Sequence, residues 1–158
     1  MDPAGHGSVK RAVTGVSGKK AILLVEDDPD QVLLALRAFK KSGITEEVEV
    51  VVRLSGEEAL DYLFETGSKE GSAMPEFVLL DVQLPKMSGM EVLKRLRCEE
   101  RTELLPVVLY SSSGEHGDVV EGYRSGANSY VTKPKDFESF SRAMRALGWY
   151  WLEWNQAP

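Results

Sequence analysis

The sequence Phe77-Val78-Leu79-Leu80-Asp81 decides the fold, because four consecutive apolar residues run directly into a carboxylate. An unbroken apolar run of this length is typical of a strand buried on both faces, as in a parallel sheet covered by helices. Residues 82–89 follow and contain Pro85 and Gly89, which indicates a loop. Asp81 is then expected at the carboxyl end of a central strand, where open α/β sheets bind their ligands. Taken alone, Asp81 also fits a capping role at the start of the loop.

Strand-like runs recur along the chain and alternate with helix-like segments. The other predicted strands are residues 21–25, 48–54, 106–110 and 129–132. Helices are predicted from Pro29, Ser55, Ser88, about Asp118 and Asp136, the last continuing through Gly148 to Trp154. Five strand–helix alternations predict an α/β fold with a doubly wound parallel sheet. Because such crossovers are right-handed, helices are expected on both faces of the sheet.

Local signals refine the first and third helices. Asp28, followed by Pro29, is expected to cap the first helix. Its apolar stripe is predicted to contain Val32, Leu33, Leu36 and Phe39. Ser88 is expected to cap the third helix.

Cys98 lies in a helical pattern and is interpreted as a small buried apolar residue.

Composition narrows the class of protein. The chain has 158 residues, 42% hydrophobic and 28% charged, which suits one globular domain. Its net charge of −6 argues against nucleic acid as a direct partner. A single cysteine, and the lack of any long apolar run, favour a reducing cytoplasm and no membrane span. Residues 1–19 carry no periodicity and are expected to be disordered.

Chemically capable side chains follow four of the predicted strands. Glu26 and Asp27 follow the first, Asp81 ends the third, Ser111 follows the fourth and Lys133 follows the fifth. Since the carboxyl ends of parallel strands lie along one edge, these side chains are expected to converge. Three neighbouring carboxylates repel one another unless a cation compensates them, and their oxygen atoms suit Mg²⁺. The ammonium and hydroxyl groups are those that an incoming phosphoryl group requires.

Each of these residues also has an ordinary structural interpretation. Glu26 and Asp27 fit a solvated turn, Ser111 fits a loop hydroxyl, and Lys133 fits a surface lysine. Their joint position at the ends of successive apolar runs favours a functional site.

These motifs resemble, in order and spacing, the receiver domain of two-component response regulators. The resemblance covers residues 20–147 and rests on residues 22–29, 79–81, 84–85, 88–89, 106–111 and 126–127, with Tyr130 and Lys133-Pro134. It implies a flavodoxin-like five-stranded sheet of order 2-1-3-4-5. It also implies a signalling protein, not an enzyme in the usual sense, that receives its phosphoryl group from a sensor histidine kinase and catalyses only its own phosphotransfer and dephosphorylation.

The resemblance assigns a role to each residue of the site. Asp81 is the phosphoryl acceptor, Asp27 is a direct ligand of Mg²⁺ (or Mn²⁺), and Glu26 helps to hold the metal, usually through water. The backbone carbonyl of Gln83 completes the coordination by the protein.

Further roles concern the bound phosphoryl group and the signal. Ser111 and Lys133 bind the phosphoryl oxygens, and Ser111 and Tyr130 form the switch. The peptide bond between Lys133 and Pro134 is expected to be cis.

Two features depart from the commonest receivers. The span from Asp27 to Asp81 is longer, owing to residues 44–46 and to residues 66–74, which are expected to form a polar loop, and residues 149–154 are rich in aromatic side chains. Both resemble the small stand-alone regulators paired with bacterial phytochromes, which makes a bacteriophytochrome a candidate kinase. The predicted parts are therefore a disordered tail (1–19), a receiver domain (20–147) and an aromatic helical extension (148–158).

The aromatic extension predicts a homodimer. Trp149, Tyr150, Trp151 and Trp154 cannot all be buried in one small core, and such side chains concentrate in interfaces. The expected interface combines this extension with the last helix, the strand at 129–132 and the helix at 118–124.

Two alternatives remain open from the residues. A Mg²⁺-dependent phosphohydrolase with an aspartate nucleophile would use the same strand end, although such enzymes usually have a second acid two residues later, where this chain has Gln83. A pseudo-receiver, which binds partners without phosphorylation, would normally have lost Asp81, Asp27 or Lys133.

Overall fold

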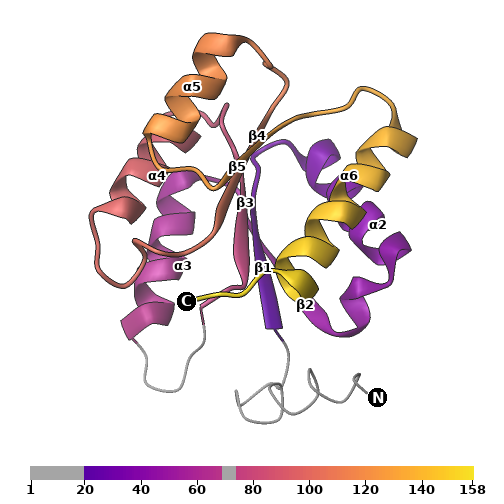
Figure 1. The fold of residues 1–158 in the computed structure, drawn as a ribbon, viewed down its shortest axis with the longest axis horizontal. Helices are drawn as coiled ribbons and strands as arrows, with labels where there is room; N and C mark the ends of the chain where they lie inside the picture. Colours follow the sequence, from indigo (N-terminus) through magenta and orange to yellow (C-terminus); the bar gives the residue numbers. More distant parts are fainter. Residues whose placement is uncertain (1–19, 69–73) are drawn as a thin grey trace.

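The buried strand β3 (Phe77–Asp81) lies at the centre of a five-stranded parallel sheet (Figure 1). The computed structural model describes residues 20–68 and 74–158. The other strands are β1 (Lys20–Val25), β2 (Val48–Arg53), β4 (Val107–Ser111) and β5 (Ser129–Thr132). The helices are α2 (Pro29–Ser42), α3 (Gly56–Ser68), α4 (Gly89–Arg97), α5 (His116–Arg124) and α6 (Phe137–Trp149), with a 3₁₀ turn η1 (Ile44–Glu46) and a π-helical turn η2 (Tyr150–Trp154). The strand order β2-β1-β3-β4-β5 confirms the predicted α/β fold and its order 2-1-3-4-5.

Helices cover both faces of the sheet, as predicted. In Figure 1, α2 and α6 lie on one side of the strands, and α3, α4 and α5 lie on the other. Successive residues of β3 point to opposite faces. Phe77 and Leu79 join the core formed with α2 and α6, whereas Val78 and Leu80 join the core formed with α3 and α4. All four are 0% exposed, which explains why the run is apolar without alternation.

Capping residues fix the helix ends next to the carboxyl edge of the sheet. The side chain of Asp28 accepts a hydrogen bond from the backbone N–H of Asp30, with Pro29 in the first turn of α2. Ser88 and Glu91 form a capping box at the start of α4. Both predicted caps are confirmed, and both helices therefore begin directly beside the strand ends that carry the acids.

Three expectations about individual elements are wrong. Leu33 is 55% exposed, because α2 instead turns the small residues Ala35 and Ala38 toward the sheet. Cys98 is exposed, because it lies at the C-cap of α4, beyond Leu96, the last buried residue of that helix. The segment expected to be a loop from residue 66 is still helical through residue 68. The predicted disordered tail, residues 1–19, lies outside the described residues.

The last helix continues into the aromatic extension, as predicted. Gly148 of α6 is buried against Ile44, and a Cβ atom at Gly148 would lie 2.5 Å from Ile44 Cδ1. Beyond it, the π-helical turn places the ring of Trp151 against Phe77, with ring centroids 6.2 Å apart. Trp154 remains 81% exposed. None of the helices in the described ranges has the length and apolar character that a membrane crossing requires.

Candidate functional site

Three carboxylates meet at the carboxyl edge of the sheet. Glu26 and Asp27 follow β1, and Asp81 ends β3, its hydrogen-bonded neighbour. One oxygen of each lies within 4.8 Å of the others. Glu26 and Asp81 are buried and Asp27 is exposed, so the cluster opens to solvent on one side. The structure therefore brings together the three acids that the sequence placed at one edge.

The loop after β3 is shaped to hold Asp81 in place. Gly89 begins α4 against the main chain of Asp81, where a Cβ atom would lie 2.3 Å from the Asp81 carbonyl oxygen. Only glycine leaves room for that approach. The N–H of Gly89 donates to the carbonyl of Val82, and the N–H of Gln83 donates to Asp81 Oδ1 at 3.0 Å. Both the backbone and the carboxylate of Asp81 are thereby fixed.

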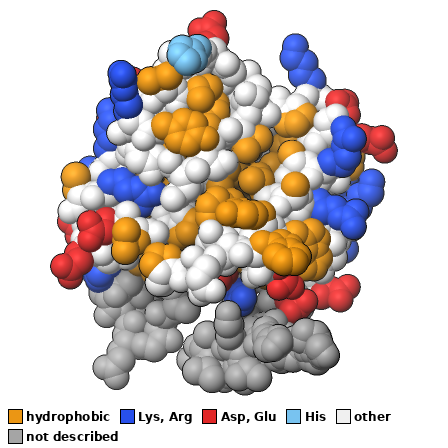
Figure 2. Space-filling model, viewed as in Figure 1, with side chains coloured by type: hydrophobic (Ala, Val, Ile, Leu, Met, Phe, Trp, Pro, Cys, Tyr) orange, Lys and Arg blue, Asp and Glu red, His pale blue; other side chains and the backbone are white. Residues whose placement is uncertain are grey.

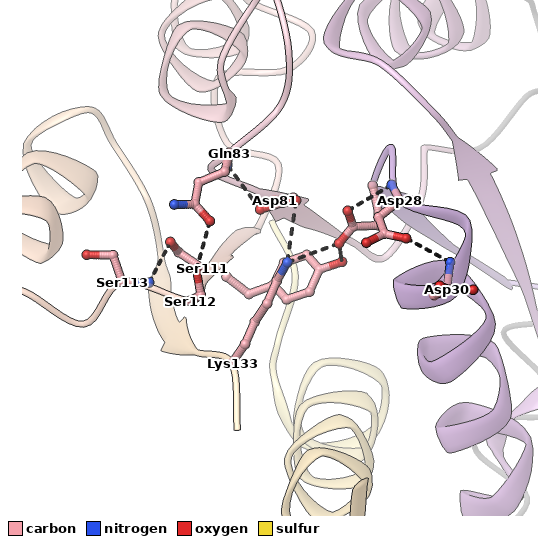
Figure 3. A network of polar contacts seen from close by, with 10 residues as sticks. Asp28, Asp30, Asp81, Gln83, Ser111, Ser112, Ser113 and Lys133 are labelled. Atoms are coloured by element: carbon pink, nitrogen blue, oxygen red, sulfur yellow. Dashed lines mark hydrogen bonds and ion pairs between the residues drawn. The ribbon is translucent and has the colours of Figure 1, made fainter. Parts of the chain in front are cut away.

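Lys133 brings a positive charge to the acids from the end of β5 (Figure 3). Its Nζ lies 3.1 Å from Glu26 Oε1 and 3.4 Å from Asp81 Oδ2. Its backbone N–H donates to the carbonyl of Ser111 at 2.7 Å, which ties the end of β5 to the end of β4. One ammonium group thus compensates two buried carboxylates in part.

The expected cis bond between Lys133 and Pro134 is not found. Every peptide bond within the described ranges is trans, including this one. Trans is the intrinsically preferred isomer of a bond before proline, by about 0.5–1 kcal/mol. The prediction of a cis bond is therefore wrong. The ammonium of Lys133 nevertheless lies beside Glu26 and Asp81, as expected.

Tyr110 belongs to the site, and the sequence reasoning missed it. It is 1% exposed on β4, and its hydroxyl donates to Glu26 Oε1 at 2.8 Å. Lys133 Nζ lies 4.5 Å from the centre of its ring. The sequence does contain a signal for this role. Tyr110 interrupts an otherwise aliphatic run one residue before the end of the strand, and a buried tyrosine hydroxyl needs a hydrogen-bond partner.

Burial and charge change the proton affinities of two groups. Burial raises the pKa of the Asp81 carboxyl to about 6, and the nearby charge of Glu26 adds to this, while the N–H of Gln83 and the ammonium of Lys133 oppose it. Burial, and then the charge of Glu26, raise the pKa of the Tyr110 phenol far above its ordinary range. Tyr110 is therefore a neutral hydrogen-bond donor at any physiological pH.

Ser111 and Tyr130 are linked through the loop that follows β4. Ser111 is buried, and its Oγ accepts a hydrogen bond from the N–H of Ser113 at 3.0 Å. The hydroxyl of Tyr130 donates to the carbonyl of Ser113 at 2.8 Å. On the other side, Ser112 donates to the side-chain carbonyl of Gln83 at 2.9 Å, so the loops after β3 and β4 are joined across the edge (Figure 3).

The acids fit a hard divalent cation. Carboxylate oxygens are the ligands that Mg²⁺ and Mn²⁺ prefer, and three of them converge here around a single ammonium group. The exposure of Asp27 leaves an entry path and room for water. Glu26, Asp27 and Asp81 are thus a chemically suitable set, and Lys133 and Ser111 lie at the same edge.

Comparison with known proteins agrees with this geometry. Residues 22–145 match the response regulator receiver domain. The chain is 40% identical to a probable methanogenesis regulatory protein, FilR2, of Methanothrix harundinacea, over 87% of this chain and 86% of that protein. It is 32% identical to the response regulator Rcp1 of Synechocystis, over 88% of this chain and 93% of that protein.

Solved structures show the same likeness. The phosphorylated cyanobacterial phytochrome response regulator RcpA superposes with a TM-score of 0.79 at 31% identity, over 89% of this chain and 99% of that one. The bacteriophytochrome response regulator AtBRR gives a TM-score of 0.66 at 41% identity, over 87% and 96%. The sheet order 2-1-3-4-5, the acidic carboxyl edge and the match to the family over most of the chain all agree. The chain belongs to the response regulator receiver domain family and is a phosphoacceptor signalling protein, not a conventional enzyme.

Proposed function

We propose that Asp81 accepts a phosphoryl group from a phosphohistidine of a sensor kinase, in a reaction that requires Mg²⁺ or Mn²⁺. The observation that carries this proposal is the position of the Asp81 carboxylate, which is buried at a strand end beside Glu26, Asp27 and the ammonium of Lys133. A relative, Rcp1, has been crystallised in a Mn²⁺-bound form, which supports the choice of ion.

The residues divide the chemistry between them. A carboxylate oxygen of Asp81 attacks phosphorus in line, its bond to phosphorus forms, and the phosphorus–nitrogen bond to the histidine breaks with the electron pair left on the imidazole nitrogen. Lys133 turns its ammonium from Asp81 to the phosphoryl oxygens, and Ser111 donates its hydroxyl to them. A metal held by Asp27, Glu26, Asp81 and the Gln83 carbonyl would supply charge neutralisation.

The signal leaves through the loop after β4. Ser111 shifts toward the phosphoryl group, and the Ser113 carbonyl carries the hydroxyl of Tyr130 with it. Tyr130 lies on β5, between α5 and α6, so the face formed by these three elements changes. An altered face changes which proteins the chain binds.

The partner we favour is a sensor histidine kinase of the bacteriophytochrome type. Several similar solved structures are phytochrome or bacteriophytochrome response regulators, and together with the aromatic extension they support this choice. Such kinases take phosphoryl groups from ATP, so we place the encounter in the cytoplasm.

The aromatic extension supports a homodimer. Trp149 and Trp151 pack partly against the protein's own core, which leaves Tyr150 (50% exposed) and Trp154 (81% exposed) as the candidates for contact. Figure 2 shows hydrophobic side chains gathered over the middle of the face that carries β5, with α5 on one side and α6 on the other. A second copy meeting this face would cover both the gathered side chains and the extension.

Two observations favour phosphotransfer over the alternatives. Gln83 occupies the position where a phosphohydrolase usually has its second acid, and its side chain accepts a hydrogen bond from Ser112. A pseudo-receiver would normally have lost Asp81, Asp27 or Lys133, whereas here all three lie in one pocket.

Radiolabelled acetyl phosphate or a phosphorylated kinase tests the proposal. The wild-type chain is expected to gain acid-stable, base-labile label in the presence of Mg²⁺. Asp81→Asn removes the nucleophile at nearly constant shape and is expected to gain none. Equal labelling of Asp81→Asn would refute Asp81 as the acceptor, and release of inorganic phosphate from a generic phosphate ester would favour the hydrolase.

A further inference from the structure

We propose that Tyr110 is a positioning residue for metal binding: its hydroxyl holds Glu26 in place at the edge of the acidic cluster, and its ring backs the ammonium of Lys133. The proposal rests on the metal-dependent phosphotransfer proposed above. It concerns a buried residue of the sheet to which the sequence motifs gave no role.

Glu26 is held by three donors from three separate segments. Its Oε1 accepts the hydroxyl of Tyr110 at 2.8 Å and the ammonium of Lys133 at 3.1 Å. Its Oε2 accepts the backbone N–H of Asp28 at 3.2 Å. With both oxygens engaged and the residue 1% exposed, the carboxylate has one orientation, and that orientation brings it within reach of Asp27 and Asp81.

The three donors differ in how far they can move. Lys133 is shared between Glu26 and Asp81, and phosphoryl transfer requires its ammonium to turn toward the phosphoryl oxygens. The N–H of Asp28 is a main-chain group and binds the other oxygen of Glu26, Oε2, at 3.2 Å. Tyr110 is 1% exposed in the central part of the sheet, next to β3, and its ring packs in the core formed with α2 and α6.

Tyr110 is therefore the donor that remains on Glu26 Oε1 when Lys133 leaves. A rigid donor behind a metal-binding carboxylate keeps the ligand aimed at the ion, and loss of such a donor typically weakens metal binding 10- to 100-fold. The ring adds a second effect, because the face of an aromatic ring attracts an ammonium group and so gives Lys133 a fixed starting position 4.5 Å from the ring centre.

The test is Mg²⁺ binding by isothermal titration calorimetry, checked by the free Mn²⁺ signal in electron paramagnetic resonance. Tyr110→Phe keeps the ring and removes only the hydroxyl, and it is expected to raise the Kd for both ions about tenfold. Tyr123→Phe removes a hydroxyl from the half-exposed tyrosine on α5 and is the matched control, with a Kd equal to that of the wild type. Circular dichroism confirms that each variant is folded.

A double-mutant cycle with Glu26→Gln separates positioning from general damage. If Tyr110 acts through Glu26, Tyr110→Phe adds no further loss of affinity in the Glu26→Gln background. A Kd of Tyr110→Phe within twofold of the wild-type value overturns the proposal, as does a full tenfold loss in both backgrounds.

The phosphorylation rate gives an independent readout. The slower labelling of Tyr110→Phe by acetyl phosphate is expected to recover when Mg²⁺ is raised to saturate the variant, whereas a defect that persists at saturation overturns the positioning role. If the wild type takes no label at all, the proposed phosphotransfer is refuted. The role of Tyr110 is still decided in that case, because the metal affinities are measured independently of labelling.

Discussion

Lys133 Nζ lies 3.4 Å from Asp81 Oδ2 and 3.1 Å from Glu26 Oε1, so one ammonium group joins acids that follow two different strands. The Lys133 ammonium supplies positive charge beside the three carboxylates of the pocket. Its removal should therefore affect both stability and phosphotransfer.

Lys133→Met is expected to lower the free energy of unfolding by about 3 kcal/mol in EDTA, because it leaves buried carboxylates without their partner. It should also slow labelling by acetyl phosphate at least about tenfold. Lys135→Met, at an exposed lysine two residues later, is the control and should change neither quantity. Urea unfolding and a labelling time course measure the two effects, and equal stability of the two variants would contradict the expectation.

The raised pKa of Asp81 predicts how stability depends on pH in EDTA. In the folded chain the pKa is about 6, against an ordinary value of 3.8, so between these values the folded state binds more protons than the unfolded state. The contribution of Asp81 to the free energy of unfolding should therefore fall as pH rises from about 4 to about 6, and then level off.

Asp81→Asn removes this titration, so the difference in unfolding free energy between wild type and variant isolates it. The difference should shift in favour of the variant across pH 4 to 6 in EDTA, and Mg²⁺ should restore the wild type at higher pH. A difference that stays constant from pH 4 to 8 would show that burial does not raise the pKa of this carboxyl.

Two glycines of α5 offer a matched pair for the switch. A Cβ atom at Gly122 would lie 2.9 Å from Tyr130 Cδ2 and 3.0 Å from Leu109 Cδ1, whereas at Gly117 it would meet nothing within 4 Å. Gly122→Ala is expected to cost about 1–3 kcal/mol and to displace the ring of Tyr130, seen as a shift of its NMR resonances. Gly117→Ala should be neutral or stabilise by up to about 1 kcal/mol. An unshifted Tyr130 in Gly122→Ala would show that the ring is not held by this contact.

The tryptophans of the extension should separate into two roles. Trp154 is 81% exposed, so Trp154→Ala is expected to leave the unfolding free energy of the monomer unchanged and to weaken the proposed dimer. Trp151 packs on Phe77, so Trp151→Ala is expected to lower the unfolding free energy by about 2 kcal/mol. Light scattering after gel filtration measures the mass, and a monomeric wild type at high concentration, with and without acetyl phosphate, would count against the dimer.

The sequence predicted most of the sheet because burial on both faces leaves a simple signal. Residues 77–81 could be assigned from their apolar run alone, and Asp28 and Ser88 from the chemistry of helix caps. The acids Glu26, Asp27 and Asp81 could be brought together because parallel strands end at one edge. The strand order itself came from family resemblance, because local patterns do not say which strands are neighbours.

What escaped prediction depends on contacts between distant segments. Tyr110 acts through Glu26, 84 positions away, and a pattern in β4 cannot reveal that partner. Leu33 was wrongly predicted to be buried. The leucines and alanines of α2 lie on adjacent faces, so the sequence fits burial of either face, and in the structure Ala35 and Ala38 face the sheet. The isomer of the bond before Pro134 was likewise outside what residue order can fix.

The close contact between Gly89 and the main chain of Asp81 has a practical consequence for protein engineering. The hydrogen bond from Gly89 to Val82 closes the intervening loop on itself, so the main chain that carries the acceptor is held by backbone contacts and not by exposed side chains such as that of Lys86. Redesign of this loop can therefore be confined to such exposed positions, provided that residue 89 never acquires a side chain.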